Sequence, residues 1–83
     1  SSNTRGERDI ERARYLQVAG HYNEAIRAYR SAIGSGARGE AFQGIAQSYQ
    51  RLGDAESARN SYKSAIRAYE KEQNTNPRLA QQG

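Results

Sequence analysis

The chain has 83 residues, enough for one domain with a modest core, and it lacks the cysteines that a disulfide or a thiolate metal site would need. Hydrophobic residues make up 35% and charged residues 27% of it, a balance that suits small amphipathic helices, and no apolar run approaches the roughly 20 residues of a membrane span. The net charge of +4 is ordinary for a soluble domain and does not by itself predict a nucleic-acid partner.

The N-terminus shows no signal peptide, because Ser1 to Thr4 are polar and no apolar stretch follows them. The chain also begins without a methionine. We therefore expect an excised domain or a processed piece of a larger protein.

The first unit of the chain has apolar residues at helical spacing on both sides of a glycine. Ile10, Ala13 and Leu16 precede Gly20. The stripe that follows consists of Ala25, Ile26, Tyr29, Ala32 and Ile33. Recurrence at this spacing is typical of amphipathic helices, and glycine favours a helix end. The pattern predicts two helices that meet beside Gly20. After them, the glycine-rich residues 34–39 are predicted to form a loop.

The second unit follows the same plan. Its first helix is predicted from Phe42, Ile45, Ala46, Tyr49 and Leu52, and its second from Ala58, Tyr62, Ala65, Ile66 and Tyr69. Gly53 suits the end of the first helix, and Asp54 is placed to cap the second. We expect the last helix to reach about Gln73, and Pro77 to begin a further helix.

The two units repeat at an offset of 33 residues. Residues 20–33 and 53–66 share Gly, Ala, Tyr, Ser, Ala and Ile in the same order and spacing. Upstream, Ala13 aligns with Ala46 and Gln17 with Gln50. An ordered set of this kind indicates an internal structural repeat.

This pattern resembles the tetratricopeptide repeat family, whose period is about 34 residues. The residues that carry the resemblance in the second unit are Phe42, Ile45, Ala46, Tyr49, Gly53, Ala58, Tyr62 and Ala65. The first unit keeps Gly20, Ala25, Tyr29 and Ala32 but has Asp9 and Arg12 where the family has large apolar residues. Because of these two residues, we expect the first helix to pack differently from the family pattern.

The resemblance implies an all-α fold of four antiparallel helices in a short right-handed superhelical stack. One repeat would occupy about residues 6–38 and the next about 39–72, and residues 73–83 would form a tail or a truncated capping helix. At least three repeats are usually needed for stability, so two repeats suggest missing neighbours, a cap or self-association.

In this family the first helix of each unit lines a concave groove, and the resemblance implies the same here. The residues opposite the predicted core face are Glu7, Ile10, Arg14, Gln17 and Val18, and then Glu40, Gln43, Gln47, Gln50 and Arg51. We predict that peptide binding depends on Ile10, Arg14, Gln17, Gln43, Gln47, Gln50 and Arg51. Glutamine can donate and accept hydrogen bonds along an extended peptide, and arginine can bind a carboxylate. Glutamines that only solvate an exposed helix would give the same pattern.

The sequence gives less support to other kinds of functional site. The lysine and asparagine clamp of chaperone-tail-binding members is missing, because Ile10, Arg14, Glu40 and Gly44 are among the residues at its positions. His21, with Glu24 three residues later, is a weak metal pair and fits a helix start better. We predict no enzyme activity, no cofactor and no metal.

The predicted function is a non-catalytic adapter that binds a protein or peptide through the concave face. A first alternative is an assembly module that forms homo-oligomers through its terminal helix faces, with Tyr62, Ile66 and Tyr69 in the contact. A lesser alternative is a nucleic-acid contact through the basic stripe of Arg59, Lys63, Arg67 and Lys71. The sequence identifies neither the partner nor the compartment.

Overall fold

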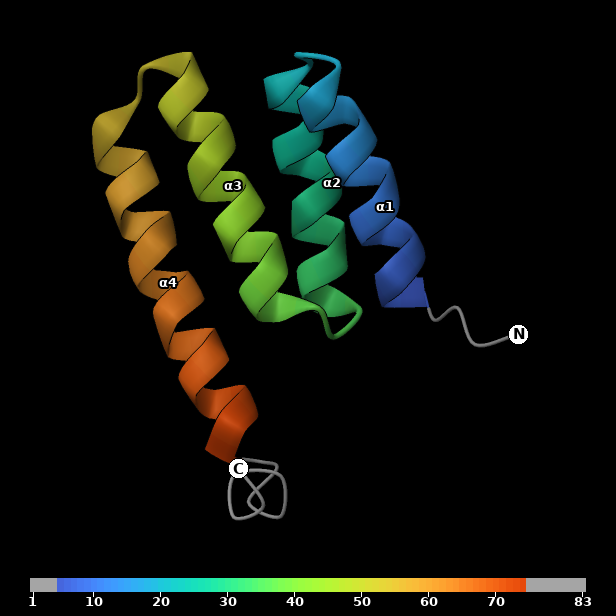
Figure 1. Ribbon diagram of the computed structural model, residues 1–83, viewed down its shortest axis with the longest axis vertical. Coiled ribbons are helices and arrows are strands. Elements are labelled where there is room, and N and C mark those ends of the chain that lie inside the picture. The colour runs from blue at the N-terminus through green and yellow to red at the C-terminus, as the bar shows by residue number, and fades with distance from the viewer. Residues whose placement is uncertain (1–4, 75–83) are drawn as a thin grey trace.

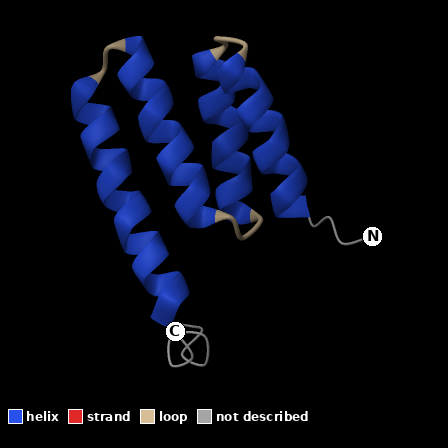
Figure 2. Ribbon diagram, viewed as in Figure 1, coloured by secondary structure: helices blue, strands red, loops and turns tan. Residues whose placement is uncertain are grey.

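The computed structural model describes residues 5–74, and these form four α-helices and no strand. The helices are α1 (Arg5–Val18), α2 (Tyr22–Gly34), α3 (Arg38–Leu52) and α4 (Ala55–Asn74). Consecutive helices run antiparallel, with α2 between α1 and α3 and with α4 beside α3 (Figure 1). Short loops join them (Figure 2). The predicted all-helical fold of two helix pairs is confirmed, whereas the capping helix predicted at Pro77 lies outside the described residues.

Each helix pair turns at a glycine in the left-handed region, as the sequence predicts. Gly20 has φ 86° and Gly53 has φ 85°, a conformation that side chains rarely adopt. The residues after them bond back to the preceding helix, from His21 N to Leu16 O at 2.9 Å and from Asp54 N to Tyr49 O at 3.0 Å. These bonds satisfy carbonyls that a helix end would otherwise leave unpaired.

The second helix of each pair begins differently. The Asp54 carboxylate accepts a hydrogen bond from Ser57 N at 3.1 Å, so the predicted cap is confirmed. Hydrogen bonds from the hydroxyl and the backbone N–H of Ser57 hold the pKa of Asp54 below its ordinary value. His21 occupies the equivalent place before α2, as predicted, but its side chain makes no capping hydrogen bond.

The predicted loop at residues 34–39 is too long. Helix α2 includes Gly34 and α3 begins at Arg38, so only residues 35–37 connect them. Gly36, at φ 109°, makes the turn. Gly39 has a packing role instead, because a Cβ atom there would lie 2.6 Å from the ring of Tyr69 on α4. The first turn of a helix can therefore use glycine where another helix approaches closely.

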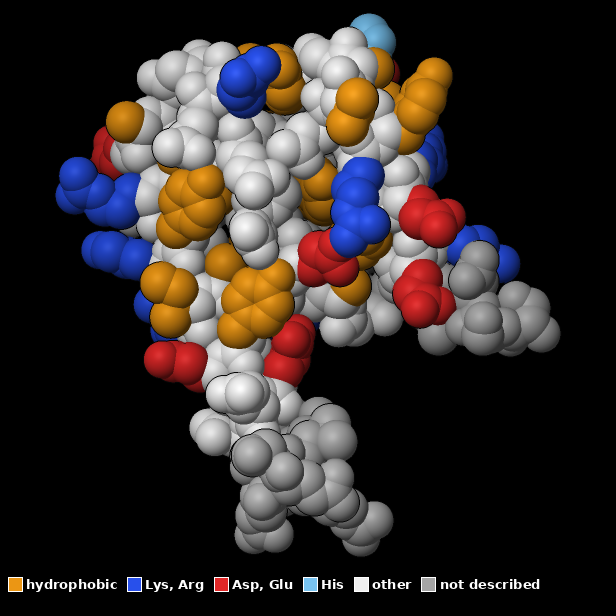
Figure 3. All heavy atoms as spheres, in the orientation of Figure 1, with side chains coloured by type: hydrophobic (Ala, Val, Ile, Leu, Met, Phe, Trp, Pro, Cys, Tyr) orange, Lys and Arg blue, Asp and Glu red, His pale blue; other side chains and the backbone are white. Residues whose placement is uncertain are grey.

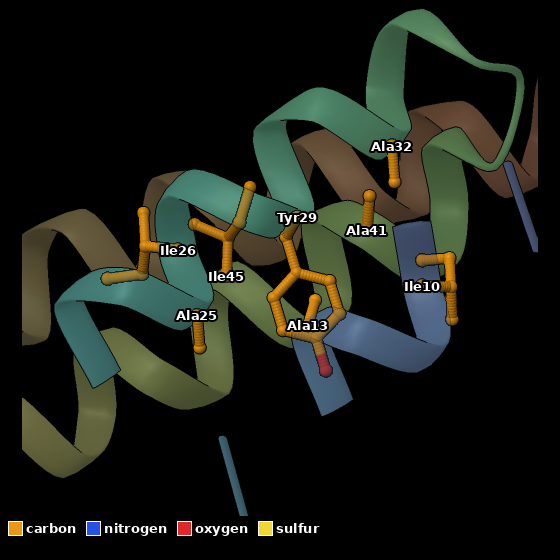
Figure 4. Close-up of a cluster of buried hydrophobic side chains, with 8 residues drawn as sticks. All are labelled: Ile10, Ala13, Ala25, Ile26, Tyr29, Ala32, Ala41 and Ile45. Carbon is orange, nitrogen blue, oxygen red and sulfur yellow. The ribbon is translucent and has the colours of Figure 1, made fainter. Parts of the chain in front are cut away.

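The core lies where α1, α2 and α3 meet (Figure 4). Its buried residues are Ile10, Ala13, Ala25, Ile26, Tyr29, Ala32, Ala41 and Ile45. Small alanines let the helices approach, and the ring of Tyr29 fills the space beside them. Gly44 provides room for that ring, since a Cβ atom there would overlap it.

The apolar stripe predicted on α4 is buried only in part. Ala58 and Ala65 are buried, but Ile66 is 58% exposed and Tyr69 41% exposed. Leu52, predicted in the core of the second unit, is 43% exposed. Within residues 5–74, α3 is the only helix that packs on α4, so the far side of the stripe faces solvent.

Candidate functional site

A hollow opens between α1 and α3, on the face predicted to be the groove. It is a cavity of about 340 Å³. Its lining residues are Arg14, Gln17, Val18, Tyr29, Glu40, Gln43, Gly44 and Gln47. We call this cavity the α1–α3 groove. Tyr29 comes from α2, which lies between α1 and α3 (Figure 1). The other described lining residues belong to α1 or α3.

A chain of hydrogen bonds crosses the groove from helix to helix. The Tyr29 hydroxyl donates to Gln17 Oε1 at 2.5 Å, and Gln17 Nε2 donates to Gln47 Oε1 at 3.0 Å. The three side chains belong to α2, α1 and α3. Because each bond fixes the orientation of the next amide, the chain holds the side chains in one arrangement.

Burial keeps the first donor of this chain protonated. The pKa of Tyr29 is raised above its ordinary value of 10.0, chiefly because burial disfavours the charged phenolate, and the charge of Arg14 offsets part of the rise. The Tyr29 hydroxyl is thus a donor to Gln17 at neutral pH.

An ion pair bridges the two helices of the groove. Arg14 Nη2 contacts Glu40 Oε2, and the two side chains are 56% and 42% exposed. Figure 3 shows a basic and an acidic side chain in contact over the space between α3 and α1. The pair neutralises the charge of Arg14. A smaller cavity of about 250 Å³ adjoins it and is lined by Glu7, Ile10, Glu11, Arg14, Ala37 and Glu40.

Two further glutamines of α3 accept hydrogen bonds from tyrosines of α4. The Tyr69 hydroxyl donates to Gln43 Oε1 at 2.9 Å. The Tyr62 hydroxyl donates to Gln50 Oε1 at 2.7 Å. Gln43 lines the α1–α3 groove, whereas Gln50 lines a separate cavity beside α4.

Four of the seven predicted site residues come together in the groove, namely Arg14, Gln17, Gln43 and Gln47. Ile10 is 3% exposed and belongs to the core, so it forms a wall of the smaller cavity rather than an exposed anchor. Gln50 lies beyond the groove. Arg51 turns away from it, since its Nε donates to the Tyr22 hydroxyl at 3.1 Å and its guanidinium lies 5.9 Å from that ring.

The sequence reasoning missed Tyr29 as a groove residue. Its pattern places Tyr29 in the core, and the residue is indeed 2% exposed, yet its hydroxyl reaches the groove through Gln17. A signal was available, because Tyr62 and Gln50 repeat the same pair 33 residues later and form the same hydrogen bond. Two residues that recur together at one offset indicate a contact as well as a repeat.

The remaining candidates are surface features. His21 Nδ1 lies 3.4 Å from Glu24 Oε1, with both side chains more than half exposed. Within the described residues no group of three or more histidine or acidic side chains is placed to hold a metal ion. The basic stripe of Arg59, Lys63, Arg67 and Lys71 is exposed, and Figure 3 shows basic side chains along the outer edge of α4. Among the helices of residues 5–74, none combines the length and apolar character of a membrane-crossing segment.

Comparison with known proteins identifies the repeat. A family model described as tetratricopeptide repeat matches residues 39–72, the segment that contains most of α3 and α4. No curated protein and no solved structure matches the chain. Members of the matched family are in general non-catalytic modules for protein–protein interaction. Residues 39–72 therefore match a tetratricopeptide repeat, and the four-helix architecture of residues 5–74 is consistent with a fragment of that kind.

Proposed function

We propose that the chain is a non-catalytic adapter that binds a peptide segment of a partner protein in the α1–α3 groove. The observation that carries this proposal is the hydrogen-bonded chain from Tyr29 through Gln17 to Gln47 beneath an open cavity of about 340 Å³. Polar side chains held in one orientation lose little freedom when a ligand binds, and such preorganisation favours affinity.

The volume of the groove limits the size of the ligand that can bind. A cavity of about 340 Å³ holds a few side chains of an extended peptide and not a folded surface. Two helices form its sides, so the ligand lies across α1 and α3 and bridges both repeats. Binding through one short groove predicts a modest affinity that further repeats or further contacts would increase.

The test is a selection from a displayed library of random peptides, followed by NMR mapping of the selected peptides on the labelled protein. The proposal expects shifts at Gln17, Gln43 and Gln47, and loss of those shifts in Gln47→Glu. Arg51→Glu is the matched control, because Arg51 lies on the same helix outside the groove. Selected peptides that shift only the outer face of α4 would show that the groove is not the binding surface.

One observation supports a second candidate, assembly through α4. Exposed Ile66 and half-buried Tyr62 line a cavity of about 490 Å³ on the side of α4 away from α1 and α2. Self-association through this face would make the sedimentation mass rise with concentration, and Ile66→Asp would abolish the rise. A constant monomer mass at all concentrations would eliminate this candidate.

A further inference from the structure

The glutamines of the groove are oriented, and their orientation decides what they can bind. Each has its carbonyl oxygen engaged by a donor of the protein. Gln47 accepts from Gln17, and Gln43 accepts from Tyr69. Within residues 5–74, neither Gln43 nor Gln47 donates a hydrogen bond from its amide nitrogen. The atoms of these two amides that bond nothing within residues 5–74 are therefore the N–H donors, whereas each carbonyl oxygen already accepts one hydrogen bond.

Tyrosines on the second helix of each pair set this orientation. The ring of Tyr69 packs against Gly39, where the absence of a side chain lets it approach α3. The Tyr69 hydroxyl donates a hydrogen bond to Gln43 at 2.9 Å. Tyr29 packs against Gly44 in the same way, and it fixes the orientation of the Gln47 amide through its hydrogen bond to Gln17. The glycine and tyrosine pairs make Tyr29 and Tyr69 positioning residues for the two glutamines of the groove.

The charges of the site argue against an acidic ligand. Among residues 5–74, Arg14 is the only cation that lines the groove, and it forms an ion pair with Glu40. The adjoining cavity adds the Glu7 and Glu11 carboxylates to its lining. A carboxylate moved into this site would lose hydration without an unpaired positive charge to replace it. Neutral carbonyl oxygens are the acceptors that fit the exposed amide donors.

An ordinary peptide presents an N–H group with every carbonyl, and an N–H that faces the amide donors would be left without a partner. Proline has a carbonyl oxygen but no N–H, and runs of proline adopt the extended polyproline II conformation before they bind.

We infer that the α1–α3 groove selects proline-rich segments, whose carbonyl oxygens accept hydrogen bonds from the side-chain amides of Gln43 and Gln47. This inference rests on the proposed adapter function and specifies the class of its ligand. It assigns specificity to Tyr29 and Tyr69 and needs no charged group on the peptide.

The test is an NMR titration that follows the side-chain NH₂ signals of the glutamines. The probes are an N-acetylated, C-amidated decaproline, a Gly-Ser repeat peptide of the same length, and an oligoglutamate. Decaproline should shift the signals of Gln43 and Gln47 in a saturable way and bind at least about tenfold more tightly than either other peptide. Its affinity should be the same at low and high salt, because no ion pair forms.

Variants separate positioning from packing. Gln43→Glu replaces the donor with an acceptor of equal size and should weaken decaproline binding by about tenfold or more. Tyr69→Phe keeps the ring on Gly39 but releases the Gln43 amide, so the Gln43 NH₂ signal should move without ligand and the preference for decaproline over Gly-Ser should fall several-fold. Tyr62→Phe is the matched control, because Tyr62 orients Gln50 outside the groove, and it should leave both readouts unchanged.

The result that overturns the inference is decaproline that leaves Gln43 and Gln47 unshifted, or an oligoglutamate that binds more tightly. If library-selected peptides still bind the groove in that case, the adapter function stands and only the ligand class is wrong. If they bind elsewhere or not at all, both proposals fail.

Discussion

Tyr29 and Tyr62 occupy equivalent positions in the two repeats, and each donates its hydroxyl proton to a glutamine of the preceding helix. Their surroundings differ. Tyr29 lies between α1 and α3 and is 2% exposed, whereas Tyr62 has only α3 beside it within residues 5–74 and is half-buried. Ile33 and Ile66 differ in the same direction. The residue sets which contact can form, and the next helix in the stack sets how much that contact is buried.

The first helices of the two repeats differ in the opposite direction, since here the residues of the second repeat are the more buried ones. On α3, Ile45 and Ser48 are buried, and their equivalents on α1 are Arg12 and Tyr15, which are exposed. No helix of residues 5–74 packs on that side of α1. Arg12, which departs from the family pattern, therefore lies on a solvent-facing side, where an apolar residue would gain nothing from burial. Asp9, the other departure, is half-buried and accepts a hydrogen bond from the Ser35 hydroxyl.

The largest expected difference between the two repeats is in the stability lost when Tyr29 or Tyr62 is truncated to alanine. Tyr29→Ala should lower the free energy of unfolding by about 3–5 kcal/mol, because it empties a fully packed site, and this is enough to unfold much of a domain of this size. Tyr62→Ala should cost less, about 1–2 kcal/mol, since Tyr62 is only partly buried. Urea unfolding followed by circular dichroism measures both, and equal losses would contradict the account.

The glycines beneath the tyrosines give a second, smaller contrast. Gly44→Ala places a methyl group against the buried ring of Tyr29, and we expect a loss of about 1–3 kcal/mol. Gly39→Ala meets Tyr69, which is 41% exposed and can turn into solvent. Because alanine also favours the helix, the net change at Gly39 should stay within about 1 kcal/mol. Thermal melts of the two variants decide the order.

The helix caps differ between the repeats and can be exchanged. His21→Asp should raise the free energy of unfolding by about 0.5–1 kcal/mol, because α2 lacks the side-chain cap that Asp54 gives α4. Asp54→Ala should lower the melting temperature, and Asp54→Asn should lower it less, since asparagine also caps. His21→Ala is the control and should have almost no effect. A His21→Asp variant no more stable than the parent would show that the turn geometry forbids the cap.

The smallest expected effect is on the alkaline stability. The pKa of Tyr29 is raised by burial, so the unfolded chain loses this proton first, at about pH 10. The contribution of Tyr29 is fully present below about pH 10 and is lost as the pH rises through its higher native pKa. Urea midpoints across this range should therefore fall more steeply for the parent protein than for Tyr29→Phe. Equal slopes would mean that the hydroxyl titrates alike in both states.

Helices, turns and the repeat were predictable because each depends on local residues. Gly20 and Gly53 end their helices and Asp54 caps α4, as expected from neighbours in sequence. Gly39 was misassigned to a loop because the close approach of Tyr69 from another helix leaves no local signal. Gly34 was misassigned because α2 continues to this residue, where a Cβ atom would meet open space.

The site was predictable to the level of a helix face. The helical period places Arg14, Gln17, Gln43 and Gln47 on the groove side. It could not reveal that Arg51 turns to Tyr22, or that Glu40 pairs with Arg14, because these contacts depend on side-chain directions across helices. The orientation of each amide depends on a tyrosine from another helix and follows from the assembled structure alone.

The central position of α3 has a consequence for motion. It is the only helix of residues 5–74 that contacts the other three, whereas α4 packs on α3 alone. Opening can therefore start at either end of the module, and the backbone amides of α3 should exchange their hydrogens with solvent last. The groove includes this slowest helix, so the backbone of its α3 wall should persist through the brief openings of α4. Those openings break the hydrogen bond from Tyr69 to Gln43 and so release the side chain of Gln43 alone.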